Sequence, residues 1–249
     1  MAGHSHAANV ARRKNAVDAK RAKIFSKCAK AILSAVKQGG PDPDQNLKLK
    51  YAIEKAKAAN MPKDNIARAI KSAAGDNKGD MEELSYEGYA VAGVAVMVQA
   101  LTDNRNRTAA DLKHLFEKRG GNLGSPGSVS FMFDFRSIFV VNTDGKSEDD
   151  LTELALEVGA EDIEFDAEAT TIYADAKDFI EVKDALEASE VEFLSAEIGY
   201  VPQTMAKVPS LEEAKKVMRL IDELDDHEDV QTVFANYEFE DGWMEQLEG

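Results

Sequence analysis

The sequence predicts an α+β protein of three domains, and three observations along its 249 residues support this fold class. Apolar residues first repeat at helical spacing, and after residue 80 the spacing changes toward the alternation typical of strands. Charge is sorted in the same way, because residues 1–75 carry 16 Lys and Arg against 5 Asp and Glu, and residues 76–249 carry 14 against 41. We therefore expect a basic helical domain followed by acidic α/β domains.

The first domain, residues 1–78, is predicted as a basic arm followed by a bundle of three short helices. The first helix should end near Gly39, the second follows the turn GGPDPDQN, and the third begins at Pro62. Cys28 is the only cysteine and is expected to fill the core, which excludes an internal disulfide. The apolar stripe of the first helix recurs every four residues, at Ile24, Cys28, Ile32 and Val36.

The second domain is predicted from two separated segments, residues 79–135 and residues 205–249. The first segment favours a strand, a helix and a strand, and the second favours a helix with a Ser210–Glu213 capping box and then a strand. Neither segment covers its own apolar faces, so we expect the two to fold together. The expected elements are a strand over 91–101, a helix over 108–119, a strand over 129–135 and a strand over 230–239.

The third domain is expected as an insertion in the second, over residues 136–204. Its elements follow the order β-α-β-β-α-β, which is the split βαβ, ferredoxin-like arrangement. Its first helix should begin after Ser147, because Asp150 stands at the acceptor position of a capping box. The expected strands are 137–143, 163–165, 170–174 and 191–201.

The basic opening is the main candidate for a binding surface in a chain whose formal net charge is −16. Clustered arginines and lysines are typical of a segment that contacts nucleic-acid phosphates, whereas a helix with a solvated, lysine-rich face has the same composition. Both interpretations stay open. The candidate contacts are Arg12, Arg13, Lys14, Lys20, Arg21, Lys23 and Lys27.

A second candidate contact lies in the stretch TDNRNRTAADLKHLF. Thr108 is expected to cap a helix, which would place Arg105 and Arg107 in the preceding turn. The free N–H groups of a helix N-terminus and two guanidinium groups together suit a phosphate. The alternative is a structural turn in which Asp103 neutralises the arginines.

No catalytic constellation is evident, so we expect a non-enzymatic protein. Four histidines and one cysteine offer little for nucleophilic catalysis, and no serine lies in a nucleophile-elbow pattern. No metal or other cofactor is expected, because His4 and His6 lack companion ligands. The glycine-rich RGGNLGSPGSVSF follows a helix and leads into a strand, so it is interpreted as a helix stop and turn.

Alternating aromatic residues occur at Phe131, Phe133 and Phe135. Such alternation is found in base-stacking sheets of RNA-binding domains, but the basic and glycine residues typical of those sheets are missing here. Core packing is therefore the favoured interpretation.

The chain contains no apolar stretch of the length that a membrane span needs, and its basic N-terminus is not followed by an apolar signal-peptide region. We therefore expect a cytoplasmic protein without a membrane partner. The sequence makes no prediction of the oligomeric state.

Four ordered motifs resemble those of the YebC/PmpR family, and the resemblance covers essentially the whole chain. It implies the domain order predicted above: a helical bundle, a middle α/β domain, and a third domain inserted in the second. It also implies nucleic-acid partners, because members are described as DNA-binding transcriptional regulators and others as translation factors acting on the ribosome or messenger RNA. The motifs are ARRKNAVDAKRAKIFSK, NMPKDNIARAIK, YEGYAVAGVAVMVQALTDNRNRT and GGNLGSPGSVSFMF.

The chain departs from the family pattern at three places. His6 and Ala7 stand where the family usually has Lys and Trp, so the arm lacks one cation and one stacking aromatic. Ala11 and Arg12 replace a Lys-His pair, and Phe131 stands at a common Trp position. We expect these changes to alter target preference or affinity and to leave the fold intact.

Three functions stay open at this point. The resemblance favours a DNA-binding transcriptional regulator. The charge of −27 on residues 76–249 would repel a long duplex, which favours a ribosome- or RNA-binding translation factor. The third hypothesis is an acidic interaction scaffold whose basic arm neutralises its own acidic domains.

Overall fold

A computed structural model of the chain describes residues 17–75, 81–142, 145–165, 169–189, 191–240 and 242–247. The chain divides into two compact units, which we describe separately. The bundle unit is formed by Asp18–Ser130 and Lys215–Ala235, and the insert unit contains Phe131–Ala214 and Asn236–Gly249. Helices and antiparallel sheets occur together, which confirms the predicted α+β class.

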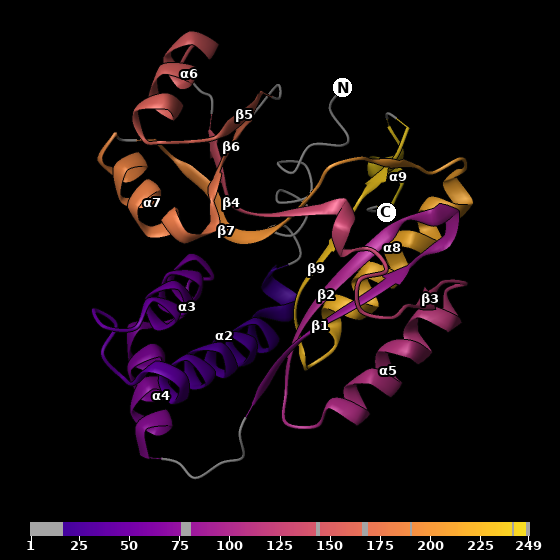
Figure 1. Cartoon of the computed structure of the whole chain (residues 1–249), viewed down its shortest axis with the longest axis horizontal. Helices are drawn as coiled ribbons and strands as arrows, with labels where there is room; N and C mark the ends of the chain where they lie inside the picture. Colours follow the sequence, from indigo (N-terminus) through magenta and orange to yellow (C-terminus); the bar gives the residue numbers. More distant parts are fainter. Residues whose placement is uncertain are drawn as a thin grey trace. The chain divides into compact units, whose positions relative to one another are not determined.

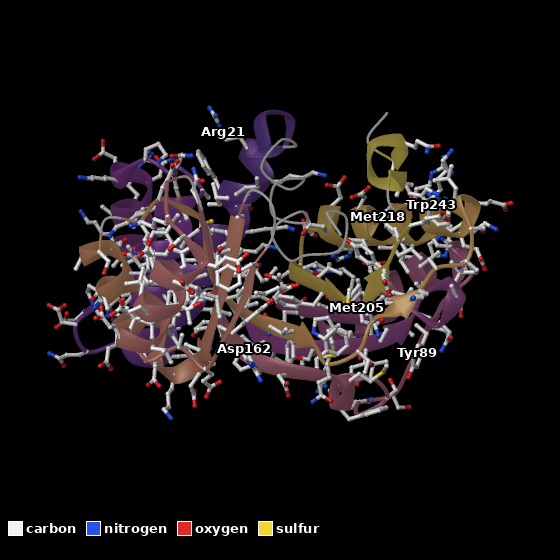
Figure 2. The ribbon with its side chains drawn as sticks, turned by 90° about the horizontal axis from the view of Figure 1, so that it is seen from above. Arg21, Tyr89, Asp162, Met205, Met218 and Trp243 are labelled. Atoms are coloured by element: carbon white, nitrogen blue, oxygen red, sulfur yellow. The ribbon has the colours of Figure 1, made fainter. Side chains whose placement is uncertain are left out.

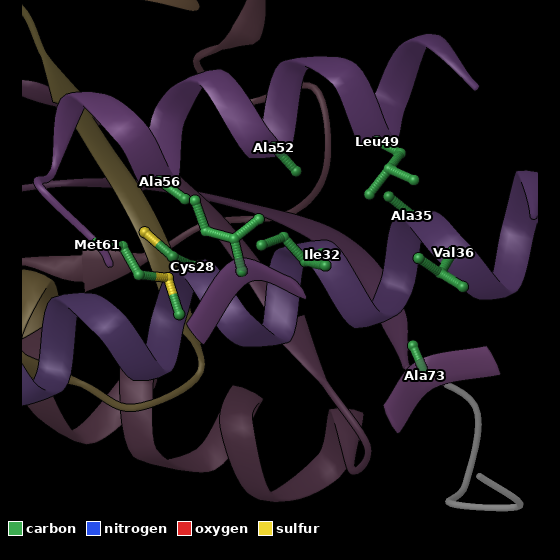
Figure 3. Close-up of a cluster of buried hydrophobic side chains, with 10 residues drawn as sticks. Cys28, Ile32, Ala35, Val36, Leu49, Ala52, Ala56, Met61 and Ala73 are labelled. Carbon is green, nitrogen blue, oxygen red and sulfur yellow. The ribbon is translucent and has the colours of Figure 1, made fainter. Parts of the chain in front are cut away.

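The bundle unit begins with three packed helices, as the sequence predicts (Figure 1). They are α2 (Val17–Gly39), α3 (Leu47–Ala58) and α4 (Lys63–Gly75). Cys28 is buried between them as expected, and burial raises the pKa of its thiol. Figure 3 shows this core, whose buried members are Cys28, Ile32, Ala35, Val36, Leu49, Ala52, Ala56, Met61, Ile66 and Ala73.

Asn46 joins the first two helices of the bundle. Its Oδ1 accepts a hydrogen bond from the Leu49 amide at 3.1 Å and so caps α3. Its Nδ2 donates to the carbonyl oxygens of Ala35 and Gly40, both at 2.8 Å. Because Asn46 is buried and uses both ends of its amide, the turn between α2 and α3 has a fixed geometry.

The bundle unit also contains a four-stranded antiparallel sheet in the order β3-β1-β2-β9. Helices α5 and α8 accompany it, and Glu223 of α8 accepts hydrogen bonds from Lys118 at the end of α5 and from Arg119 directly after it, both at 3.0 Å. The elements are β1 (Glu82–Tyr89), β2 (Ala95–Thr102), α5 (Arg105–Lys118), β3 (Asn122–Leu123), α8 (Leu211–Asp226) and β9 (Val230–Ala235).

The strand predicted over 91–101 is confirmed from Ala95 onward as β2, but its start is wrong, because the chain reverses at residues 91–93. The short helix η1 (Val91–Gly93) turns β1 back onto β2 in a hairpin. Ala92 and Gly93 have φ values of 59° and 71°, and two consecutive left-handed residues match the right-handed twist of a hairpin. Strand β1 was missed partly because its sequence, EELSYEGY, is largely polar and only two of its eight residues are buried.

The insert unit contains the second sheet, in the order β5-β6-β4-β7 with every neighbouring pair antiparallel. This order is that of the split βαβ arrangement, as predicted. The capping box of Ser147 and Asp150 at the start of α6 is also confirmed. The elements are β4 (Phe133–Asn142), α6 (Glu148–Glu157), β5 (Asp162–Phe165), β6 (Ala169–Asp175), η3 (Ala176–Asp178), α7 (Phe179–Ala188) and β7 (Phe193–Pro202).

Strand β4 replaces two predicted strands. The stretch 129–135 is not a separate strand, because η2 (Ser130–Met132) precedes a single strand that continues to Asn142. This strand crosses residue 135, where the sequence analysis places a domain boundary, and the three-domain division stays a prediction. The stretch 230–239 is likewise divided, and the remaining elements are β8 (Ala206–Lys207), β10 (Tyr237–Glu238) and α9 (Trp243–Leu247).

Candidate nucleic-acid interface

The predicted contacts of the basic arm lie at the edge of what the structure describes. Arg12, Arg13 and Lys14 fall outside the described residues, and Lys20 lies in α2 without a described side chain. Arg21, in α2, is exposed, and its side chain extends away from the ribbon (Figure 2). These residues therefore stay predictions.

A row of lysines on α2 is paired within the bundle unit. Lys23, Lys27 and Lys30 recur at intervals of four and three residues, so they lie along one side of the helix. Their ammonium groups lie 3.9, 3.5 and 3.2 Å from carboxylate oxygens of Asp226, Asp225 and Asp229, respectively. Lys27 and Lys30 also donate to the carbonyl oxygens of Asp225 and Glu228.

The location of these partners explains the pairing. Asp225 and Asp226 end α8, and the C-terminal end of a helix carries unpaired carbonyls and a negative dipole end that attract cations. Among the predicted contacts with a described side chain, Lys27 is the most enclosed, since it is 14% exposed and burial lowers the pKa of its ammonium group. We therefore leave Lys27 out of the proposed interface.

Asp229 is the centre of a buried polar cluster in the bundle unit. Its carboxylate accepts hydrogen bonds from Arg107 Nη2 at 2.8 Å, Thr108 Oγ1 at 2.9 Å and Lys30 Nζ at 3.2 Å. Burial alone would raise the pKa of Asp229, but these three donors outweigh burial and lower it. The carboxylate therefore stays ionised and ties α2 and α5 to the connection between α8 and β9.

The α5 helix begins earlier than the sequence predicts. Asn104 caps it, with Oδ1 accepting from the Arg107 amide at 3.1 Å, so the expected cap Thr108 lies inside the first turns. Thr108 instead uses its hydroxyl for the Asp229 cluster. An asparagine cap was within reach of sequence analysis, because Asn ranks with Ser and Asp at this position.

The two arginines of this stretch separate. Arg107 is held between Asp103 at 3.0 Å and the buried Asp229, which raises the pKa of its guanidinium through hydrogen bonds. This pairing agrees with the structural alternative, so Arg107 is also left out of the proposed interface. Arg105 is 64% exposed and its guanidinium lies 3.9 Å from Glu82, a surface contact of little strength. Arg105 keeps its proposed role.

A cationic helix surface was missed by the sequence analysis. Lys63, Arg68 and Lys71 are exposed on α4, whose core side packs through Ile66 and Ala73. The amphipathic spacing of NMPKDNIARAIK indicates this cationic surface, because the positions that do not face the core carry Lys and Arg. These residues extend the basic surface of the bundle beyond α2.

The aromatic alternation does not pack in a core as expected. Phe133 is buried, but Phe131 is 69% exposed and Phe135 is 50% exposed. Phe135 lies against Tyr200 of β7, with ring centroids 5.0 Å apart. Alternation places side chains on one face of a strand, but it does not reveal whether another element covers that face.

The glycine-rich loop after α5 is ordered by one carboxylate. Glu87 is buried and accepts hydrogen bonds from the amides of Gly127 at 2.7 Å, Val129 at 2.7 Å and Ser130 at 2.8 Å. Burial acts to raise the pKa of Glu87, and the combined hydrogen bonds overcome it and lower the pKa. With its amides directed at Glu87, the loop is a structural turn, in line with its interpretation from sequence.

The described residues contain neither a cluster of metal ligands nor a helix suited to span a membrane. No group of three or more His, Cys, Asp or Glu side chains there could hold a metal ion, and the candidate ligands His4 and His6 lie outside them. Among the described helices, none combines the length and the apolar character that crossing a bilayer requires.

Comparison with known proteins identifies the family. A model of the TACO1/YebC N-terminal domain matches residues 5–76, and a model of the TACO1/YebC second and third domain matches residues 81–237. The chain belongs to the TACO1/YebC family. The solved structure of a conserved hypothetical protein from Aquifex aeolicus has a TM-score of 0.81 and 46% identity, covering 90% of this chain and 93% of that chain.

TACO1/YebC relatives match along nearly their whole length. A probable transcriptional regulatory protein of Natranaerobius thermophilus is 46% identical, over 98% of this chain and 99% of its own. One from Geobacillus thermodenitrificans is 50% identical, over 95% and 96% respectively. Both names describe transcriptional regulatory proteins, and neither name includes an enzymatic activity. The names therefore agree with the prediction of a regulator.

Proposed function

We propose that this TACO1/YebC chain is a non-enzymatic regulator of gene expression that binds nucleic acid through its N-terminal helical bundle, acting as a DNA-binding transcriptional regulator. The observation that carries the proposal is the charge of the bundle itself. Residues 17–75 hold 13 Lys and Arg against 5 Asp and Glu, within a chain whose net charge is −16. A basic domain on an acidic protein is the electrostatic footprint of a nucleic-acid contact.

The described members of the proposed interface are exposed cations. Arg21, Lys23 and Arg105 are exposed, and Arg12, Arg13, Lys14 and Lys20 are kept from the sequence analysis. Lysine and arginine side chains on helices position a protein on the phosphate backbone, and no described element offers an evident set of side chains for base edges. We therefore expect weak sequence specificity.

The regulatory names of the relatives favour DNA, and the same charge pattern fits ribosomal or messenger RNA. Sedimentation of tagged protein through a sucrose gradient, together with mapping of promoter occupancy, separates these targets. Promoter occupancy without migration alongside ribosomal particles supports the transcriptional role. Comigration with ribosomal particles that is lost at high salt would instead support the translational role. Both results are compatible with nucleic-acid binding.

A second candidate function, the acidic interaction scaffold, is favoured by the pairing of α2 lysines with Asp225, Asp226 and Asp229. Replacement of Lys20, Arg21 and Lys23 by Ala distinguishes the two. The nucleic-acid proposal predicts weaker binding to a 20-base-pair DNA duplex with little change in thermal stability. The scaffold predicts a lower melting temperature with unchanged binding.

A further inference from the structure

Helix α4 presents three cations along one outward surface. Its core side carries Ile66, Ile70 and Ala73, of which Ile66 and Ala73 are buried. At about 100° of rotation per residue, the exposed Lys63, Lys71 and Arg68 span an arc of about 140°, which runs from the edge of the core side at Lys63 to the outer side of the helix at Arg68. Lys63 and Lys71 are eight residues apart, which separates them by about 12 Å along the helix axis.

These cations differ from the lysines of α2 in their partners. Among the described residues, no carboxylate oxygen lies within 4 Å of Lys63, Arg68 or Lys71, so no ion pair has to break before they meet an external anion. Within the described residues, the hydrogen bonds of Arg68 stay in its own helix and go to the Asp64 carbonyl at 3.3 Å and to the Asn65 side chain.

Asp64 is the single carboxylate on this side of α4 and lies in the first turn, where a negative charge interacts favourably with the helix N-terminus. Three cations against one carboxylate leave the surface positive. Three exposed neighbours of these cations on α4, Ala67, Ser72 and Ala74, are small. A partner can therefore approach the helix backbone closely, and the longer lysine and arginine side chains can extend to meet its anionic groups.

We infer that this surface of α4, formed by Lys63, Arg68 and Lys71, contacts the phosphate backbone of the nucleic acid. The inference rests on the proposed function and adds α4 to the exposed cations of α2 as a main contact. A duplex carries one charge per about 1.7 Å of its axis, so a surface about 12 Å long meets several phosphates in any register. Separate positive charges at this spacing can contact phosphates along the backbone, and such contacts do not distinguish one base sequence from another.

The test compares the full-length wild type with a Lys63→Ala, Arg68→Ala, Lys71→Ala variant. Alanine preserves helix propensity, and circular dichroism with thermal unfolding checks that the bundle remains folded. The control variant carries Lys113→Ala, Lys177→Ala and Lys207→Ala. It removes the same charge from exposed lysines that lie outside the three helices α2, α3 and α4. Affinity is measured for a random 20-base-pair DNA duplex and for a 20-nucleotide oligo(U) RNA at 50 and 200 mM salt.

If α4 makes three phosphate contacts on the duplex, the wild type should lose affinity between the two salt concentrations about 40-fold more than the α4 variant does. The control should behave as the wild type. A preference for one probe shows whether duplex or single-stranded backbone is the source of the phosphates. Equal affinity and salt dependence of the α4 variant and the control would overturn the inference, whereas failure of the wild type to bind either probe would overturn the proposed function itself.

Discussion

The guanidinium of Arg107 lies 2.8 Å from the carboxylate of Asp229, a residue 122 positions away that is 1% exposed. The same carboxylate receives Lys30 from α2, so a single buried anion joins the helical bundle to the sheet of the bundle unit. Arg107, which the sequence suggests as a phosphate contact, and Lys30 are thus both paired with a carboxylate inside the molecule. This cluster defines which part of the basic segment stabilises the fold and which part is open to a partner.

Replacing Asp229 by Asn should destabilise the protein by about 3 kcal/mol, because it leaves Arg107 and Lys30 without their buried counter-ion. Urea unfolding of the two proteins measures the difference. Asp103→Asn is the matched control, since Asp103 also contacts Arg107 but is 59% exposed. Its cost should stay below about 0.5 kcal/mol, and equal costs for the two variants would contradict the role of the buried cluster.

The pair of Glu223 with Arg119 predicts a pH dependence. Hydrogen bonds from Arg119, aided by Lys118, lower the pKa of Glu223 to about 2 from an ordinary value of 4.5. A carboxyl whose folded pKa is depressed stabilises the fold above its unfolded pKa and loses that contribution as the pH falls toward its folded pKa. Wild type should therefore exceed Glu223→Gln in unfolding free energy at pH 7, and the gap should close between pH 4.5 and 2. A gap independent of pH would refute this account.

Two phenylalanines on β4 should differ sharply in their contribution to stability. Phe139 is fully buried and stacks on Phe179 with ring centroids 5.3 Å apart, so Phe139→Ala should cost about 3–5 kcal/mol. Phe135 is half exposed, and Phe135→Ala should cost about 1 kcal/mol or less. Chemical denaturation ranks the two, and a large loss for Phe135→Ala would restore the core-packing interpretation.

Lys27→Met tests the removal of Lys27 from the interface. Methionine has a similar volume, and the Asp225 carboxylate that loses its partner is 46% exposed and can be hydrated, so stability should change by about 1 kcal/mol or less. The affinity for a 20-base-pair duplex should stay within about twofold of the wild type, because an enclosed ammonium group releases few counterions. A larger loss of affinity in the folded variant would return Lys27 to the interface.

Local signals in the sequence predicted much of the fold. The capping box at Ser147 and Asp150 and the order of elements in the insert unit depend on neighbouring residues, and both agree with the structure. Strand β1 was missed because its pairing with β2 needs a left-handed turn at Ala92, where glycine or asparagine is the usual signal.

The candidate site was less predictable, because charge composition does not identify partners. The pairing of Lys27 with Asp225 spans 198 positions and depends on how α2 meets the end of α8. The sequence suggests Asp103, four residues away, as a partner of Arg107. It gives no sign of the buried partner Asp229, because that residue is distant in the chain. The open surface of α4 was readable from its amphipathic spacing once the core side was assigned.

The dependence of nucleic-acid affinity on salt tests the central claim most directly. With about six phosphates engaged by the basic segment, log affinity of the full-length protein for duplex DNA should fall against log salt concentration with a slope near −5. An affinity that does not change with salt would contradict the claim that positive charge near the N-terminus meets an external polyanion.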